Sequence, residues 1–149
     1  MSTKIDLIGK RILWLTLKMK PFEVMVTGEK PEEFRKPTQW IKSRHHTKTK
    51  SGYKFKVYDY VVFTNGYGKH RPYFIAEMVA FTNISHAGKK VYTYSNGLTV
   101  EVENGDYIIV IGKILEIGNY ENTRHQSIPT NGCHTTKNSH YGKEQKGYN

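Results

Sequence analysis

The sequence of 149 residues is poor in cysteine, leucine, alanine and long apolar runs. Its one cysteine, Cys133, has no partner for a disulfide within the chain. Aromatic residues make up 13% of the chain, and with so few leucines and alanines this composition favours strands over helices. The apolar runs are far shorter than the roughly 20 residues of a membrane-spanning helix. Residues 1–10 also lack the apolar core of a signal peptide, so we expect a cytoplasmic protein with no membrane partner.

Acidic residues are also scarce. The chain has 13 aspartates and glutamates against 23 lysines and arginines, which gives a formal net charge of +10. Neutralisation of phosphates by lysine and arginine is the sequence-independent source of nucleic-acid affinity. The charge balance therefore points to a polyanionic partner such as RNA.

Hydrophobic patterning predicts a mainly β protein with short helices, of the α+β class. A helix opening at Pro21 places Phe22, Met25 and Val26 on one face and ends at Gly28. A second short helix is expected at 39–43, and Asn96-Gly97 gives the clearest hairpin signal. Strands are expected at 12–17, 30–35, 57–64, 72–84, 91–94, 98–102 and 107–117. With little helix between the later strands, the sheet should be mainly antiparallel and curl into a small open barrel of about six strands.

Two segments stand out by composition. Residues 42–56 contain six basic and no acidic residues, and we interpret them as a mobile, exposed loop. This loop is either simply solvated or an electrostatic arm that gathers RNA phosphates, with Tyr53 and Phe55 stacking on bases. The predicted nucleic-acid contacts are Lys42, Arg44, Lys48, Lys50, Lys54 and Lys56. Residues 119–149 contain one aliphatic residue, so we expect them to form a basic, disordered tail. The predicted organisation is then an N-terminal lead at 1–9, one domain at 10–118 and this tail at 119–149.

A dense charged motif follows the predicted first helix. It has the pattern Gly28-x-Lys30-x-x-Glu33-x-Arg35. Residues two apart on a strand project from the same face, so Glu33 and Arg35 should lie together, and Lys30 in the preceding turn is able to join them. The alternative is a surface strand whose charges pair with one another.

This motif resembles the signature of the ASCH domain family, which belongs to the PUA-like superfamily of small β-barrels. The segments YDYVVFTNGYG at 58–68, RPYFIAEMVAF at 71–81 and YIIVIGKILEI at 107–117 agree with the family in order. The resemblance covers about residues 10–118. It implies a pocket that faces RNA, a nucleotide or a nucleoside and is lined by Lys30, Glu33 and Arg35.

The resemblance also implies an enzymatic alternative, a ribonuclease or a nucleoside amidohydrolase. In the amidohydrolase branch a threonine three residues after the motif lysine is the proposed nucleophile. Glu33 occupies that position here, which removes the hydroxyl that acyl transfer needs. Glu77 is the charged residue of a long apolar strand, where we expect it to be part-buried. It is either a general acid or base acting with Lys30, or the partner of a structural ion pair with Lys30 or Arg35.

The loop at 64–71 is a further candidate. Asn65 and Tyr67 are predicted to contact a ligand, although a plain β-turn explains the same residues. Trp40 is expected to close the core rather than to stack on a base. No metal site is expected, because the adjacent His45 and His46 cannot share one face of a regular element. No cofactor is expected either.

A third alternative is a protein-interaction module whose basic loop binds an acidic partner.

Overall fold

The computed structural model describes residues 4–121, and within them the chain is mainly β with two short helices. The predicted fold class is thereby confirmed at this level. The elements are β1 (Ile12–Leu17), α1 (Met19–Val26), β2 (Glu32–Arg35), α2 (Gln39–His45), β3 (His46–Thr49), β4 (Gly52–Phe55), β5 (Tyr60–Asn65), β6 (Tyr73–Asn83), β7 (Lys89–Thr93), β8 (Thr99–Glu103) and β9 (Tyr107–Gly118).

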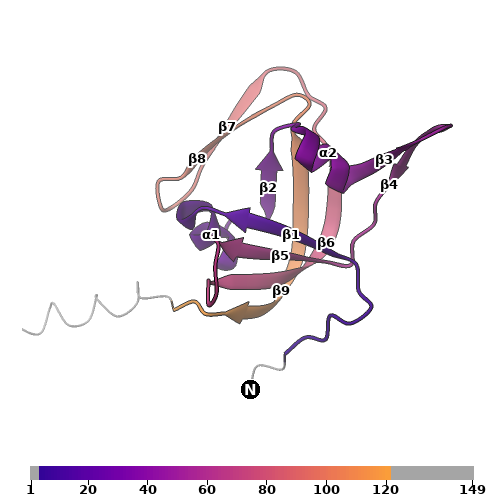
Figure 1. The fold of residues 1–149 in the computed structure, drawn as a ribbon. Coiled ribbons are helices and arrows are strands. Elements are labelled where there is room, and N and C mark those ends of the chain that lie inside the picture. Colours follow the sequence, from indigo (N-terminus) through magenta and orange to yellow (C-terminus); the bar gives the residue numbers. More distant parts are fainter. Residues whose placement is uncertain (1–3, 122–149) are drawn as a thin grey trace, which may run out of the picture.

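Five strands form one curled sheet with the order β1-β5-β6-β9-β2 (Figure 1). The β1–β5 pair is parallel and the other three pairs are antiparallel, so the predicted curled and mainly antiparallel sheet is confirmed. The sheet has five strands rather than six and is a half-barrel, with β1 and β2 at its two edges. The β3–β4 and β7–β8 hairpins are separate two-stranded sheets.

The concave face of the sheet carries the hydrophobic core. Cross-strand partners share a face, and the registers align Leu15 with Phe63 and Phe63 with Phe74 on the inner side. Helix α1 covers this face, and its fully buried Phe22 lies 5.4 Å from the Phe74 ring, measured between ring centroids. The spacing of Phe22, Met25 and Val26, which predicted the helix, also places these side chains on its buried face.

The folded body extends beyond both predicted domain boundaries. The Tyr120 ring, beyond the predicted domain end at 118, packs edge-on against Phe22 with ring centroids 5.2 Å apart. At the other end, the backbone N–H of Ile5 donates to the Glu116 carboxylate, which ties the predicted N-terminal lead to β9. The rest of the predicted tail, at 122–149, lies outside the described residues.

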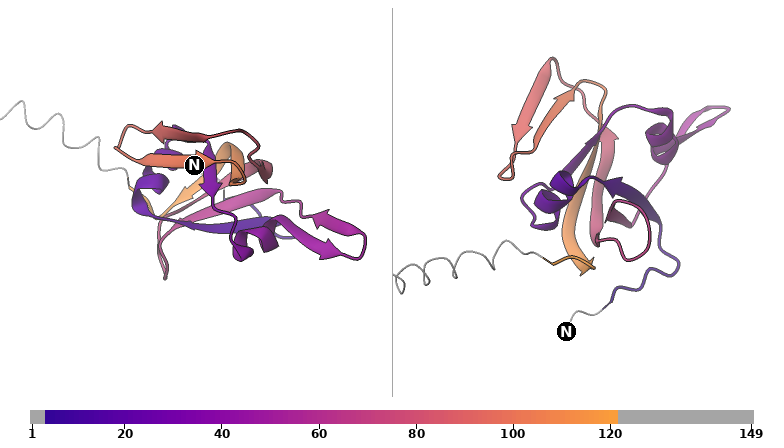
Figure 2. Two further views of the ribbon diagram at one scale, coloured as in Figure 1. Left: turned by 90° about the horizontal axis from the view of Figure 1, so that it is seen from above. Right: turned by 60° about the vertical axis from the view of Figure 1, so that its left-hand side comes forward.

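The expected loop at 42–56 consists of regular elements instead, and most of its residues are exposed as expected. These residues form the end of α2 and the β3–β4 hairpin, which projects from the sheet on the side away from β7–β8 (Figure 2). Two observations explain the hairpin. β-branched Thr47 and Thr49 and aromatic Tyr53 and Phe55 supply strand-forming residues, and Gly52 adopts a φ of +136° that favours glycine.

Candidate functional site

The three charged residues of the sequence motif meet at the edge of the sheet. The Lys30 ammonium donates to Glu33 Oε2 at 3.0 Å, and Arg35 Nε donates to Glu33 Oε1 at 2.8 Å. Arg35 Nη2 also donates to the carbonyl of Thr16 at 2.8 Å, which links the β2 edge of the half-barrel to the β1 edge. The predicted convergence of Lys30, Glu33 and Arg35 is confirmed, and one carboxylate neutralises one of the two cations.

This motif cluster is buried rather than open. Lys30 is 1% exposed and also donates to the carbonyl of Glu32. Its ammonium lies 5.4 Å from the Phe34 ring centroid and 5.8 Å from that of Tyr94, in cation–π contact with both. Burial is the main cause that raises the pKa of the Tyr94 hydroxyl. The Phe34 and Tyr94 rings therefore cover the Lys30 ammonium, and Glu33 pairs with it.

The β7–β8 hairpin holds that cover in place. Its tip is fixed by two hydrogen bonds from Ser95, through its backbone N–H at 2.7 Å and its hydroxyl at 2.6 Å, to the Glu29 carboxylate. Asn96 Nδ2 donates to the carbonyl of Lys20 in α1 at 2.9 Å. The Tyr92 ring stacks on Phe34 with centroids 5.5 Å apart. The hairpin is thus packed on α1 and β2 over the motif cluster.

Glu77 does not belong to the motif cluster. Glu33 pairs with core residue Ile109 and faces the inner side of the sheet, whereas Glu77 pairs with Tyr60 and lies on the outer side. It is exposed, so the expectation of a part-buried carboxylate is wrong. Its Oε2 accepts the backbone N–H of Lys113, beside the irregular β6–β9 register. Among residues 4–121, no hydrogen bond or ion pair joins Glu77 to Lys30 or Arg35, so the structure does not bring the predicted acid–base pair together.

The loop at 64–71 separates its two predicted ligand contacts. Asn65 is part-buried, and its Nδ2 donates to the carbonyl of Leu17 at 3.1 Å, which joins the end of β5 to the end of β1. Tyr67 is 89% exposed at the tip of the loop. The two side chains therefore have different surroundings, with Asn65 engaged in the fold and Tyr67 presented to solvent.

Residues 42–56 form what we name the basic arm. Lys48 pairs directly with Tyr53 across the hairpin, and His46 with Phe55, so these four side chains share one face. Tyr53 is 63% and Phe55 64% exposed. A cavity of about 500 Å³ lies between α2 and this face, and Lys42, Lys48, Lys56 and Tyr53 are among its lining residues. The arm therefore presents amino groups beside accessible aromatic rings.

Two residues at the base of the basic arm differ from expectation. Trp40 is 46% exposed, and the Arg44 guanidinium lies 4.6 Å from its ring centroid, so the expectation that Trp40 closes the core is wrong. His45 instead is buried, with its ring 4.9 Å from both Phe81 and Tyr107 and 5.2 Å from Phe55. This ring anchors the arm to the main sheet.

The anchor should respond to pH. Burial, followed by the neighbouring His46, lowers the pKa of His45 from its ordinary value of 6.5. The unfolded chain then takes up the proton before the folded chain does, so the contribution of neutral His45 to stability is complete above about pH 6.5 and is lost as pH falls through the lowered pKa. We expect the Tm to fall over this interval and His45→Phe to weaken that dependence, measured by thermal unfolding between about pH 7.5 and 5.

The matched control for this prediction is His86→Phe, which changes a part-buried histidine of another loop, outside the contacts of His45. It should keep the pH dependence of the unmodified chain. If Tm falls with pH as much in His45→Phe as in the unmodified chain, the His45 ring does not cause the pH dependence of Tm.

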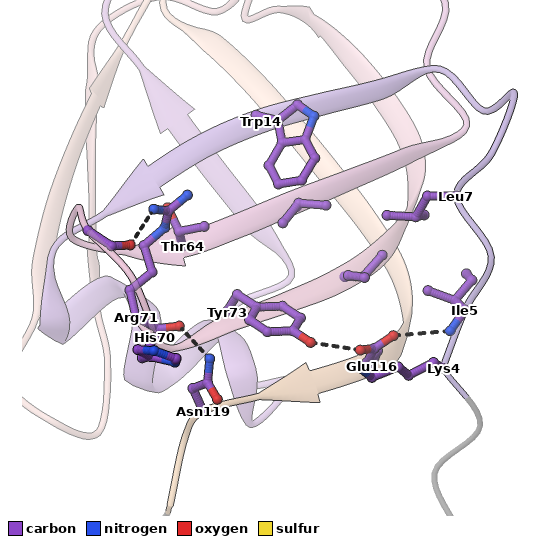
Figure 3. A pocket seen from close by; sticks show the side chains of 13 residues that line it. Lys4, Ile5, Leu7, Trp14, Thr64, His70, Arg71, Tyr73, Glu116 and Asn119 are labelled. Atoms are coloured by element: carbon purple, nitrogen blue, oxygen red, sulfur yellow. Dashed lines mark hydrogen bonds between the residues drawn. The ribbon is translucent and has the colours of Figure 1, made fainter.

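Sequence reasoning missed a cavity on the outer face of the sheet (Figure 3). It has a volume of about 400 Å³, and Trp14, Thr64, Arg71, Tyr73 and Glu116 are among its lining residues. Tyr73 donates its hydroxyl to Glu116 Oε1 at 2.7 Å, and this bond raises the pKa of Tyr73. The available signal was the alternation in β1, which places Trp14 opposite the buried leucines.

Comparison of the chain with protein-family models, with curated protein sequences and with solved structures finds no match. Among the described residues, neither helix has the length and apolar character needed to cross a membrane. The functional argument therefore depends on the geometry of the motif cluster, the basic arm and the outer cavity.

Proposed function

We propose that this protein binds RNA or a nucleotide-containing ligand, and that the basic arm supplies its phosphate contacts. The observation that carries the proposal is the face on which Lys48 and Tyr53 are cross-strand partners. Cross-strand side chains lie about 5 Å apart at their Cβ atoms, so a base stacked on Tyr53 keeps its phosphate within reach of Lys48.

The charge of the arm supports the same ligand class. All six basic residues of 42–56 lie on α2 or the hairpin or next to them, and the segment contains no aspartate or glutamate to oppose them. Lys42 and Lys56 line the same cavity as Lys48 and Tyr53, so cations surround the stacking position. Single-stranded nucleic acid is bound by this combination of a positive groove and stacking rings.

The ASCH resemblance supports an RNA or nucleotide ligand as well, through the motif Gly28-x-Lys30-x-x-Glu33-x-Arg35. In our proposal the motif cluster has a structural role while the β7–β8 hairpin covers it, since Lys30 is 1% exposed. Arg35 and Glu33 hold the two sheet edges together, and they reach a ligand after the hairpin is displaced. We assign the hydrolase alternative no residues, because Lys30 pairs with Glu33 on the inner side of the sheet, whereas Glu77 lies on the outer side.

The salt dependence of RNA binding tests the proposal. Binding of a fluorescein-labelled single-stranded RNA should weaken linearly on a logarithmic plot of affinity against salt, with a slope of about −0.7 for each neutralised phosphate. Three to four contacts by the arm predict a slope of roughly −2 to −3 by fluorescence anisotropy. Affinity that does not change with salt would contradict the phosphate contacts.

A further inference from the structure

We propose that the outer cavity binds a nucleoside 5′-monophosphate, with the base against Trp14 and the phosphate at Arg71. This inference rests on the proposed function for one point. That point is the choice of a nucleotide as the ligand that combines a flat ring with a negative charge. The cavity lies on the convex face of the sheet, opposite the core, and is lined by β1, β5, β6, β9, the N-terminal segment and the loop at 68–71. Its volume of about 400 Å³ lies within the range of small-ligand sites, roughly 300–1,000 Å³.

The surface for a flat ring is formed by Trp14 and the sheet. Val62 and Ile75, which line the floor, are 2% and 4% exposed, whereas Trp14 beside them is 54% exposed. Tyr73 lies across the cavity from Trp14 (Figure 3). An apolar floor with accessible aromatic walls favours a planar ligand that stacks.

The anion position is formed by Arg71. Its Nη1 donates to the carbonyl of Gly68 at 2.7 Å, which holds the guanidinium in place. Its Nε is buried and is the one such side-chain nitrogen or oxygen within residues 4–121 that has no hydrogen-bond partner. A buried N–H without an acceptor is unfavourable, and a phosphate oxygen is a strong acceptor for an arginine. Lys4 also lines the cavity and adds positive charge.

Glu116 sets the orientation of the ligand. Glu116 is 9% exposed, and its carboxylate accepts from the Tyr73 hydroxyl and from the backbone N–H of Ile5. Arg71 and Glu116 lie toward different ends of the cavity in Figure 3. A phosphate is therefore attracted to the Arg71 end and repelled from the Glu116 end, where the amino group of a base finds an acceptor.

Tryptophan fluorescence tests this inference directly. The chain has two tryptophans, so a Trp40→Phe background leaves Trp14 as the reporter. We expect adenosine 5′-monophosphate to change the Trp14 emission saturably. Adenosine alone and inorganic phosphate alone should each bind at least about tenfold more weakly, since each makes half of the contacts. Arg71→Gln should weaken binding of the nucleotide by about tenfold or more and leave adenosine unaffected.

The matched control is Lys69→Gln, which removes a charge from the same loop at a residue that does not line the cavity. Equal losses in the Arg71→Gln and Lys69→Gln variants, or no saturable response to the nucleotide, would overturn the inference. Trp14→Leu, followed by calorimetry, is a second variant, and it leaves the core unchanged because Trp14 is 54% exposed on the face opposite the buried leucines. Nucleotide affinity equal to that of the unmodified chain in this variant would also overturn the inference.

The test separates this site from the basic arm. A variant with Lys42, Lys48, Lys54 and Lys56 changed to Gln should bind adenosine 5′-monophosphate as the unmodified chain does. If the arm variant binds both the nucleotide and RNA as the unmodified chain does, the result supports this cavity and contradicts the role of the arm. Nucleotide binding lost in the arm variant and kept in Arg71→Gln would overturn the cavity.

Discussion

Lys30→Ala is expected to lower the free energy of unfolding by about 3–5 kcal/mol, the cost of breaking a buried ion pair by removing one partner. The substitution leaves Glu33 with Arg35 as its remaining cation and removes the donor to the Glu32 carbonyl. It also empties the space between the Phe34 and Tyr94 rings. Urea unfolding followed by circular dichroism measures the loss.

The matched control for Lys30 is Lys89→Ala. Lys89 pairs with Glu101 at 3.3 Å, and both side chains are about 60% exposed. An exposed pair of this kind contributes about 0–1 kcal/mol, so the control should unfold close to the unmodified chain. Equal stability of the two variants would contradict the account of the motif cluster as a buried structural network. RNA binding lost in Lys30→Ala is evidence for a contact only when that variant is shown to be folded.

The largest expected effect on binding comes from the basic arm. Changing Lys42, Lys48, Lys54 and Lys56 to Gln should reduce affinity for single-stranded RNA by about 100-fold at about 0.15 M salt, because each lost phosphate contact costs about 0.6 of a decade there. These lysines are exposed, so stability should change little. Fluorescence anisotropy with labelled RNA measures the change.

The control variant carries the same charge change at Lys10, Lys18, Lys90 and Lys113, which are exposed on other parts of the molecule. If affinity depends on the position of the charges, this control should keep most of the affinity of the unmodified chain. Equal losses in both variants would mean that net charge alone attracts RNA, and the arm would then have no special role.

Local patterns were the part of this molecule that sequence could predict. Asn96-Gly97 predicted the β7–β8 hairpin, and Gly97 adopts the φ of +83° that such a turn requires. The two-residue spacing of Glu33 and Arg35 predicted that they meet. The docking of the hairpin is different in kind. The hydrogen bond that docks it joins Asn96 to Lys20, which are 76 residues apart, and no local pattern relates them. The sequence therefore could not predict that Tyr94 covers Lys30.

The errors at Glu77 and at the outer cavity have a related cause. Expecting a part-buried Glu77 assumed that both faces of β6 are covered along its whole length. The outer face is open at this point, as the 63% exposure of Val79 shows. Trp14 and Arg71 come from different segments, and only the fold places both beside Tyr73. Spacing in a sequence assigns a side chain to a face of its strand, and the neighbouring elements decide whether that face is covered.

The measurement that tests the central claim most directly is a ¹⁵N–¹H correlation spectrum of the protein titrated with a short single-stranded RNA. The account predicts that the largest shifts fall on amides of α2, β3 and β4, with Lys48 and Tyr53 among them. Shifts centred on β2, β7 and β8, with the arm unchanged, would contradict the account and place the RNA at the motif cluster.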